Sequence, residues 1–484
     1  MEKENLQPKL VFDCFAEVNK VPRPSKHEDA MAEFLVRFGN ALGLPTKTDR
    51  VGNVAISKPA TPGLEHLPGV ILQSHMDMVC EKNADVEFDF MKDPIRTYID
   101  GDWLKAQGTT LGADDGIGVA MQMAILKSTD IAHGPIQCVF TRDEETGLSG
   151  AEGMGSDFME GQYLINLDSE DEGEIFVSCA GGATTVAEFP FTRAAVPAGY
   201  YTARVTVRGL TGGHSGDDIN KNRANANKLL VRFLVEEMGK TALRLIDIQS
   251  GGLHNAIPRE GSAVIAVPAS FRDQLSADLN LLLADARKEF AVTEPDLAME
   301  LSTEPAATEG QEPDETRRML LALLAVHNGV YAMSQSIEGF VATSSNLASI
   351  RLQPDTGTVR VVTSQRSSLL SDRMNISAVV RAAFTLGGAL KVETGEGYPG
   401  WETNPDSILV RKAVESYERL FGHKPVVRGI HAGLECGLFS VKYPHLDMVS
   451  FGPTLRGVHS PDERLLIPTV QMVWDHLLDL LKSI

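Results

Sequence analysis

The order of strand-like and helix-like segments is the feature of this sequence that most limits its fold. Up to about residue 185, short runs rich in β-branched and apolar residues, such as 69–79 and 136–142, alternate with helical patterns such as 116–128. This alternation is typical of an α/β domain with a mostly parallel sheet covered by helices. The pattern changes after residue 195 and returns from about 394. We therefore expect an α/β domain interrupted by a long insertion.

The inserted region follows an order of its own. From about 195 to 392 it passes twice through strand, helix, strand, strand, helix and strand, and the stretch 302–316 between the two passes reads as an exposed loop. Each pass has the order of a ferredoxin-like α+β unit, so we predict an α+β lid domain of two such halves. The predicted domains are 1–190 together with 394–484 for the first, and 191–393 for the lid.

Composition limits the partners and the compartment. At 484 residues the chain exceeds the size of one core, and with 43% hydrophobic residues it can build two. The formal net charge of −20 argues against nucleic acid or an anionic membrane as partner. No apolar stretch approaches the ~18 residues of a membrane span, and the first residues lack a signal-peptide core. Five well-separated cysteines without a CxxC pair suggest reduced thiols. We expect a soluble, cytoplasmic protein.

Polar side chains gather where the predicted strands of the first domain end. In open α/β sheets, ligands bind at the carboxyl ends of the strands. Imidazoles and carboxylates at matching strand ends indicate a dinuclear metal site, and mixed nitrogen and oxygen ligands suit zinc. The residues in question are His75, Asp77, Asp114, Asp115, Glu144, Glu145, Asp168 and His459.

Each of these residues also has a plainer interpretation. His75 alone could be a hydrogen-bonded core residue, and Asp114 could cap the helix that follows it. Asp168 could belong to the solvated acidic run 168–174, and Glu144 and Glu145 could face water. Their coincidence at one edge of one sheet favours the metal site.

Eight motifs in order resemble those of the aminoacyl-histidine dipeptidases, the PepD-type branch of the M20 metallopeptidases. The likeness spans nearly the whole chain and implies a zinc-peptidase-like catalytic domain that hydrolyses Xaa-His dipeptides such as β-Ala-His. The motifs are SHMDMV, TTLGADDGIG, DEETG, INLDSEDEGE, GGHSG, NAIPRE, HAGLECGLF and GPTLRGVHSPDE.

The resemblance also implies a ligand set for two zinc ions, which cobalt or manganese could replace. His75 and Asp168 would hold one ion, Glu145 and His459 the other, and Asp114 would bridge them. A cis peptide bond between Asp114 and Asp115 is implied as well.

Catalytic roles follow from the same resemblance. Glu144 would act as general base toward a water shared by the two ions. Asp77 would hydrogen-bond His75 and fix its tautomer. Adjacent strand-end residues point in different directions, so Glu144 and Glu145 can take separate roles. We expect Asp143, the first acid of this run, to be solvated.

In the predicted lid, the resemblance implies that His214 stabilises an oxyanion. Asn255 and Arg366 match substrate-holding positions, and an Arg suits a free C-terminal carboxylate. The plainer interpretations are an exposed loop His and a solvated Arg. Residues 217–223 depart from the family pattern, so substrate contacts there stay open. The motif HAGLECG, with its His and Glu, predicts a strand-to-helix turn at the substrate pocket.

Other functions remain as alternatives. An M20-type deacylase of N-acyl amino acids would keep the metals and change the substrate, although the long lid and HAGLECG favour the dipeptidase. A nucleotide-binding protein could cradle phosphate with LGADDGIG, but the GxGxxG spacing is lacking. A metal-free binding protein is also possible, but its ligand residues would then have to be remnants of a metal site that no longer binds metal. A homodimer is one option. If the lid consists of two fused halves, however, one chain could supply the two-lid arrangement that simpler relatives reach by dimerising, so the oligomeric state stays open.

Overall fold

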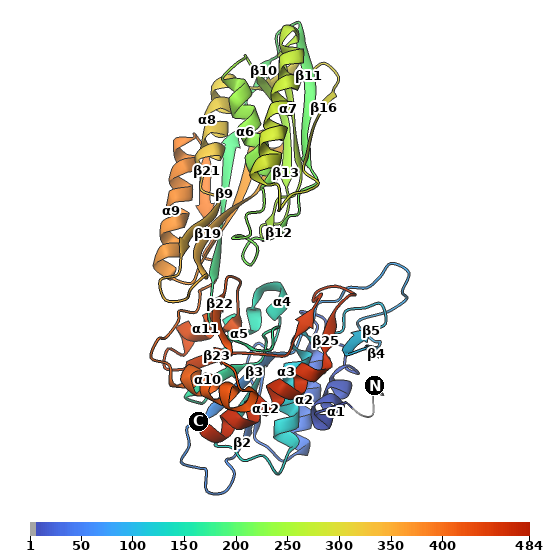
Figure 1. Ribbon diagram of the computed structural model, residues 1–484, viewed down its shortest axis with the longest axis vertical. Helices are drawn as coiled ribbons and strands as arrows, with labels where there is room; N and C mark the ends of the chain where they lie inside the picture. The colour runs from blue at the N-terminus through green and yellow to red at the C-terminus, as the bar shows by residue number, and fades with distance from the viewer. Residues whose placement is uncertain (1–5) are drawn as a thin grey trace. The chain divides into compact units, whose positions relative to one another are not determined.

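The computed structural model describes residues 6–484, which form two compact units (Figure 1). The first unit contains the chain up to Ser178 together with Trp401–Gly429 and Leu434–Ile484. The second contains Cys179–Gly400 and Ile430–Gly433. The first unit is therefore discontinuous in sequence. Within the described residues, no helix is long and apolar enough to cross a membrane.

The first unit is built on a mixed eight-stranded sheet with the order β1-β2-β6-β3-β7-β23-β8-β22. Its centre is parallel: β6 (Ile136–Thr141), β3 (Val70–His75), β7 (Tyr163–Asn166) and β23 (Asp447–Ser450) run in one direction. Every residue of β3, β6 and β7 is buried, as expected for parallel strands covered on both faces. The outer strands are β1 (Thr46–Thr48), β2 (Val54–Lys58), β8 (Glu174–Cys179) and β22 (Val426–Ile430).

Helices and a small second sheet complete this unit. The helices are α1 (Lys9–Val18), α2 (Asp29–Ala41), α3 (Ala113–Lys127), the short α4 (Glu144–Gly147) and α5 (Ser149–Gly153), α10 (Ile408–Phe421), α11 (Glu435–Lys442) and α12 (Ile467–Ser483). The small sheet has the order β24 (Leu455–Arg456), β25 (Arg464–Leu466), β5 (Trp103–Ala106) and β4 (Thr97–Asp100).

His476 on the buried face of α12 makes the stability of this unit depend on pH. Its Nε2 lies 2.9 Å from the carbonyl oxygen of Ala413, and its ring packs against Tyr417 and Phe451. Burial lowers the pKa of His476 to about 4. The unfolded chain binds this proton with an ordinary pKa of about 6.5. Protonation therefore favours the unfolded state, and stability falls as pH drops from about 6.5 towards 4.

We expect His476→Gln to remove this part of the acid sensitivity. Gln does not titrate and can still donate to the Ala413 carbonyl. Between pH 7 and pH 5 the wild type should lose about 2 kcal/mol more unfolding free energy than the variant, because a tenfold change in proton affinity corresponds to about 1.4 kcal/mol. Urea unfolding of both proteins at the two pH values measures the difference. Equal losses would contradict the low pKa.

The second unit is built on a nine-stranded sheet in which all neighbouring strands are antiparallel. The strand order is β16-β11-β15-β13-β19-β20-β9-β21, and β18 also pairs with β19. The strands are β9 (Gly181–Pro190), β11 (Tyr200–Arg208), β13 (Arg244–Gly251), β15 (Gly261–Pro268), β16 (Ala298–Thr303), β18 (Gly329–Met333), β19 (Val341–Gln353), β20 (Thr358–Ser367) and β21 (Lys391–Thr394).

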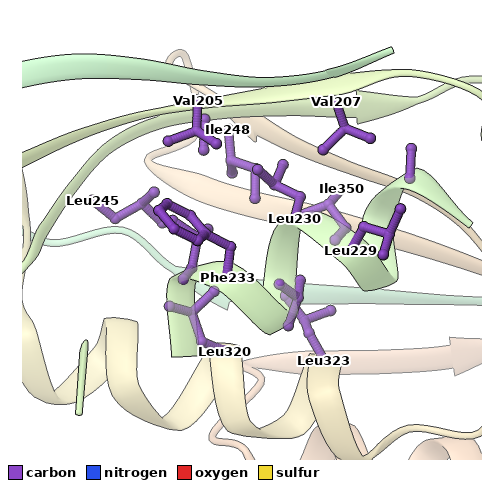
Figure 2. Close-up of a cluster of buried hydrophobic side chains, with 14 of the residues drawn as sticks. Val205, Val207, Leu229, Leu230, Phe233, Leu245, Ile248, Leu320, Leu323 and Ile350 are labelled. Atoms are coloured by element: carbon purple, nitrogen blue, oxygen red, sulfur yellow. The ribbon is translucent and has the colours of Figure 1, made fainter. Parts of the chain in front are cut away.

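Apolar helix faces pack on this sheet to form the core of the second unit. The helices are α6 (Ala226–Met238), α7 (Arg272–Glu289), α8 (Pro313–Ala325) and α9 (Leu370–Leu386). Figure 2 shows the centre of the core, where side chains of α6 and α8 meet those of β11, β13 and β19. The labelled residues are Val205, Val207, Leu229, Leu230, Phe233, Leu245, Ile248, Leu320, Leu323 and Ile350.

The strand β9 corrects the predicted start of the insertion. The prediction placed residues 181–190 in the first domain, whereas β9 pairs with β20 and β21 in the sheet of the second unit. In the sheet, β9 lies between β20 and β21 and supplies the first strand of the second strand-helix repeat. In the chain, however, β9 comes before the whole of the first repeat. Sequence periodicity shows which residues of a strand are buried but not which strand it pairs with.

The loop predicted at 302–316 is exposed or partly buried at residues 302–309, but it is not entirely irregular. It contains β17 (Glu309–Gln311), which pairs with β10 (Arg193–Ala195). Gln311 is fully buried, and its Nε2 donates to the carbonyl oxygen of Pro190 at 2.7 Å. Tertiary pairing thus orders a stretch whose composition indicates only a loop.

Candidate metal centre

The parallel sheet of the first unit brings the predicted metal ligands to one edge. His75 is the last residue of β3, Glu145 lies in α4 directly after β6, and Asp168 follows β7 by two residues. Asp114 lies in the first turn of α3, where the backbone departs from helical geometry. His459 lies between β24 and β25 with a left-handed φ of +62°, a conformation uncommon outside glycine.

The carboxylate of Asp114 lies between two imidazoles. Its Oδ1 is 3.1 Å from Nε2 of His75, and its Oδ2 is 3.2 Å from Nε2 of His459. Asp168 Oδ1 lies 3.3 Å from the same nitrogen of His75, and Glu145 Oε2 lies 2.9 Å from that of His459. Two groups of candidate ligands result, and they share Asp114. In each group the ligand atoms lie within 4.8 Å of one another.

Burial argues against a solvated Asp168, whereas His75 is a buried residue whose partners are all carboxylates. The His75 side chain is 1% exposed and makes its contacts with carboxylates, and that of Asp168 is 7% exposed. Asp114 makes no capping hydrogen bond to α3, whose N-cap is Gly112. The peptide bond between Asp114 and Asp115 is cis, which confirms the prediction.

The electrostatics of this edge favour the binding of positive charge. Burial raises the pKa of Asp168 to about 7 and that of nearby Glu170 to about 8. Hydrogen bonds with Asp114 and Glu145 raise the pKa of His459 to about 11. Buried carboxylates are costly unless a cation compensates them. The mixed imidazole and carboxylate donors fit zinc.

Asp77 links His75 to the segment that carries Glu144 and Glu145. Its Oδ1 lies 3.3 Å from Nδ1 of His75. The backbone N–H groups of Glu144 and Glu145 donate to its two oxygens at 3.1 and 3.3 Å, and the Ser25 hydroxyl donates to it at 2.8 Å. Although burial acts in the opposite direction, hydrogen bonds from His75 and Ser25 keep the pKa of Asp77 below its ordinary value.

Glu144, the predicted general base, lies outside both groups of candidate ligands. Burial raises its pKa well above the ordinary value, and the charges of Asp168, Glu145 and Glu435 add to the rise. A carboxyl group with a raised pKa binds a proton more readily, which suits it to exchanging protons with a substrate.

The position of Asp143 corrects one prediction. We expected it to be solvated, but it is only 6% exposed. One carboxylate oxygen accepts from the hydroxyl of Thr146 and the other from that of Ser149, the second at 2.5 Å. Three adjacent acids are visible in the sequence. The turn between α4 and α5 brings the hydroxyls of Thr146 and Ser149 back to Asp143, and the sequence does not show this.

Sequence comparison agrees with this geometry. Residues 71–483 match the profile of peptidase family M20/M25/M40. The chain belongs to this family. A cytosol non-specific dipeptidase of Escherichia coli (strain K12) is 42% identical over 486 residues, which cover 100% of this chain and 99% of that protein. The match confirms the family predicted from the eight motifs.

Two solved structures resemble this chain over nearly its full length. The aminoacylhistidine dipeptidase from Vibrio alginolyticus is 43% identical with a TM-score of 0.91, over 100% of this chain and 98% of that one. The aminopeptidase PepT from Bacillus cereus is 16% identical with a TM-score of 0.57, over 99% of each chain, and shares the fold.

Two buried glutamates of this M20 peptidase support the site without being candidate ligands. Glu463 accepts hydrogen bonds from the backbone of residues 111–114, and no motif spacing points to that role. Glu435 begins α11 after β22, so HAGLECG forms the expected strand-to-helix turn. Its Oε2 accepts from Gln73 Nε2 at 2.5 Å and from Thr141 Oγ1 at 2.7 Å. Burial raises the pKa of Glu435 to about 8.

The remaining predicted residues lie in the second unit. His214 is in β12 (Gly213–His214), which pairs with β14 (Ala256–Ile257). Arg366 of β20 approaches it, with Nη2 3.3 Å from His214 Nε2. Asn255 is exposed, and its carbonyl oxygen accepts from the Ser215 N–H at 2.8 Å. His431 is buried, and its Nε2 lies 2.7 Å from the Ser344 hydroxyl.

Proposed function

We propose that this M20 peptidase is a cytosolic dipeptidase that hydrolyses Xaa-His dipeptides such as β-Ala-His. The observation that carries the proposal is the position of Asp114, whose two oxygens face the two separate histidines of the site. Similarity over the full length to an aminoacylhistidine dipeptidase and to a cytosol non-specific dipeptidase supports the substrate class and the compartment.

We propose that the site holds two divalent cations, of which zinc fits the donor set best and cobalt or manganese could substitute. His75 and Asp168 would hold one, Glu145 and His459 the other, and Asp114 would contact both. When bound, such a pair of cations polarises the scissile carbonyl and makes a water molecule nucleophilic near neutral pH.

The protein's own groups would then move the proton and hold the ligands in place. Glu144 would take the proton of the attacking water and return it to the leaving amine, the usual double role of an acid/base carboxylate. Asp77 would accept Nδ1–H of His75 and so leave Nε2 free to bind a cation. Because Asp77 also holds two backbone N–H groups of α4, it would fix the positions of Glu144 and Glu145 together.

We propose that the second unit is a lid of two ferredoxin-like halves, in which Arg366 and Asn255 hold the substrate. Arg366 is only 6% exposed, and its hydrogen bonds go to two neutral groups, the Tyr398 hydroxyl at 3.0 Å and His214. Its Nε has no hydrogen-bond partner among residues 6–484. A buried guanidinium in this state is suited to receive a dipeptide's C-terminal carboxylate.

His214 is proposed as the donor to the oxyanion of the attacked carbonyl. Burial and the charge of Arg366 lower its pKa below the ordinary value, which favours the neutral imidazole. A neutral imidazole carries one N–H. Arg366 Nη2 faces Nε2 and the Asp217 N–H donates to Nδ1, so His214 would have to give up one of these contacts to donate to the oxyanion. One such donor typically contributes a factor of about 10² or more to turnover.

An activity screen tests the proposed function. The zinc-loaded enzyme is assayed with β-Ala-His, Gly-His and the N-acetylated amino acids, with a chelator-treated sample as the metal-free control. We expect kcat/KM for the Xaa-His dipeptides to exceed that for N-acetyl-histidine by at least about 10²-fold, because only the dipeptides present a free amine to the site. Faster cleavage of the N-acetyl compounds would favour the deacylase instead.

A further inference from the structure

One buried carboxylate outside the proposed ligand set holds the loop that carries Asp114. Glu463 is 2% exposed, and both of its oxygens are fully engaged. Oε2 accepts from the backbone N–H groups of Leu111 and Gly112 at 2.7 and 2.9 Å. Oε1 accepts from those of Ala113 and Asp114 at 2.8 and 3.3 Å. Successive backbone N–H groups that converge in this way form a concave anion site, here filled by a side chain.

Arg23 holds the same loop through the carbonyl group of Gly112. It is 1% exposed, and its Nη2 donates to the carbonyl oxygen of Gly112 at 2.6 Å. Gly112 has a φ of +65°, and a Cβ at this position would lie 2.5 Å from Arg23 Nη2. Arg23 therefore restricts the loop at Gly112, while Glu463 holds its backbone N–H groups.

Glu463 also belongs to the loop that carries His459. Its own N–H donates to the carbonyl oxygen of Ser460 at 3.0 Å, and β25 follows it directly and pairs with β5. One side chain thus ties the loop of His459 to the loop of Asp114, although more than 340 residues separate them in the chain. His75 instead ends β3 and Asp168 follows β7, and these two strands pair with each other in the parallel sheet.

We propose that Glu463 is a positioning residue that sets the distance between Asp114 and His459. It would thereby control the affinity of the metal position formed by Asp114, Glu145 and His459, and would affect the position formed by His75, Asp114 and Asp168 less. The proposal rests on the two-metal site proposed above.

Zinc titration of metal-free, full-length protein against a chromogenic chelator tests the proposal. Glu463→Gln keeps the size of the side chain but turns an NH₂ group toward backbone donors. We expect the wild type to bind two zinc ions. In the variant one ion should bind roughly 10–100-fold more weakly, with a smaller change for the other. Asp462→Asn removes a charge from the exposed neighbouring residue and should leave both affinities unchanged.

Thermal unfolding of the metal-free proteins separates positioning from a general loss of structure. If Glu463 has a merely structural role, Glu463→Gln should weaken both zinc sites equally and lower the melting temperature of the metal-free protein. That result would overturn the proposal. So would a Glu463→Gln variant that binds both zinc ions with the affinities of the wild type. If this variant does not fold, Glu463→Asp, which withdraws the carboxylate by one methylene, should show the same selective weakening. Fewer than two zinc ions in the wild type would contradict the proposed function instead.

Discussion

Replacing Glu144 with Gln should lower kcat for Xaa-His dipeptides by about 10²–10⁴-fold while the enzyme keeps its metal. The range is that of a general acid/base whose proton transfer is lost. Metal content should not change, because Glu144 belongs to neither group of candidate ligands. Steady-state kinetics and metal analysis on the same preparation measure both quantities.

Glu152→Gln provides the matched control for this substitution. Glu152 is an exposed carboxylate in α5, the short helix that follows, and its replacement should leave kcat at the wild-type value. Full turnover by Glu144→Gln would remove Glu144 from the role of base. Loss of zinc from Glu144→Gln would instead make it a ligand.

Replacing Asp114 with Ala should abolish activity by lowering the affinity of both metal positions. Asp114 belongs to both groups of candidate ligands, so its loss removes one donor from each. We expect kcat/KM to fall by more than about 10³-fold, because metals and base act as a unit. Zinc content after dialysis against a zinc buffer should fall well below that of the wild type.

His459→Ala separates a shared ligand from an unshared one. His459 belongs to one group only, so this variant should keep one zinc ion with near wild-type affinity. Two zinc ions bound normally by Asp114→Ala would show that its carboxylate bridges nothing. Loss of the same single ion by both variants would assign Asp114 to one position only.

Much of the candidate site could be predicted because its chemistry is local in the sequence. Four of the five candidate ligands stand at or just after the end of a strand or at the start of a helix, and the hydrophobic period locates those ends. His459 lies in the loop between β24 and β25. His75 ends β3 and Glu145 follows β6, so parallel pairing alone brings them to one edge. The eight motifs then indicated the family, which the profile match confirms.

The partners of β9, the burial of Asp143 and the bonds of Glu463 had no such local signal. Each depends on contacts that the chain's periodicity does not reveal, such as those of β9 with β20 and of residue 463 with residues 111–114. A carboxylate on a loop looks the same in the sequence whether it faces water or a set of backbone N–H groups.

The α/β class, the residue types at each strand end and the family were therefore readable from the order of amino acids alone. The sheet that holds β9 and the buried side chain that fixes the Asp114 loop became visible only in the folded chain. Burial follows from local hydrophobic pattern, whereas hydrogen-bond partners far apart in the chain are selected only when the whole fold has closed.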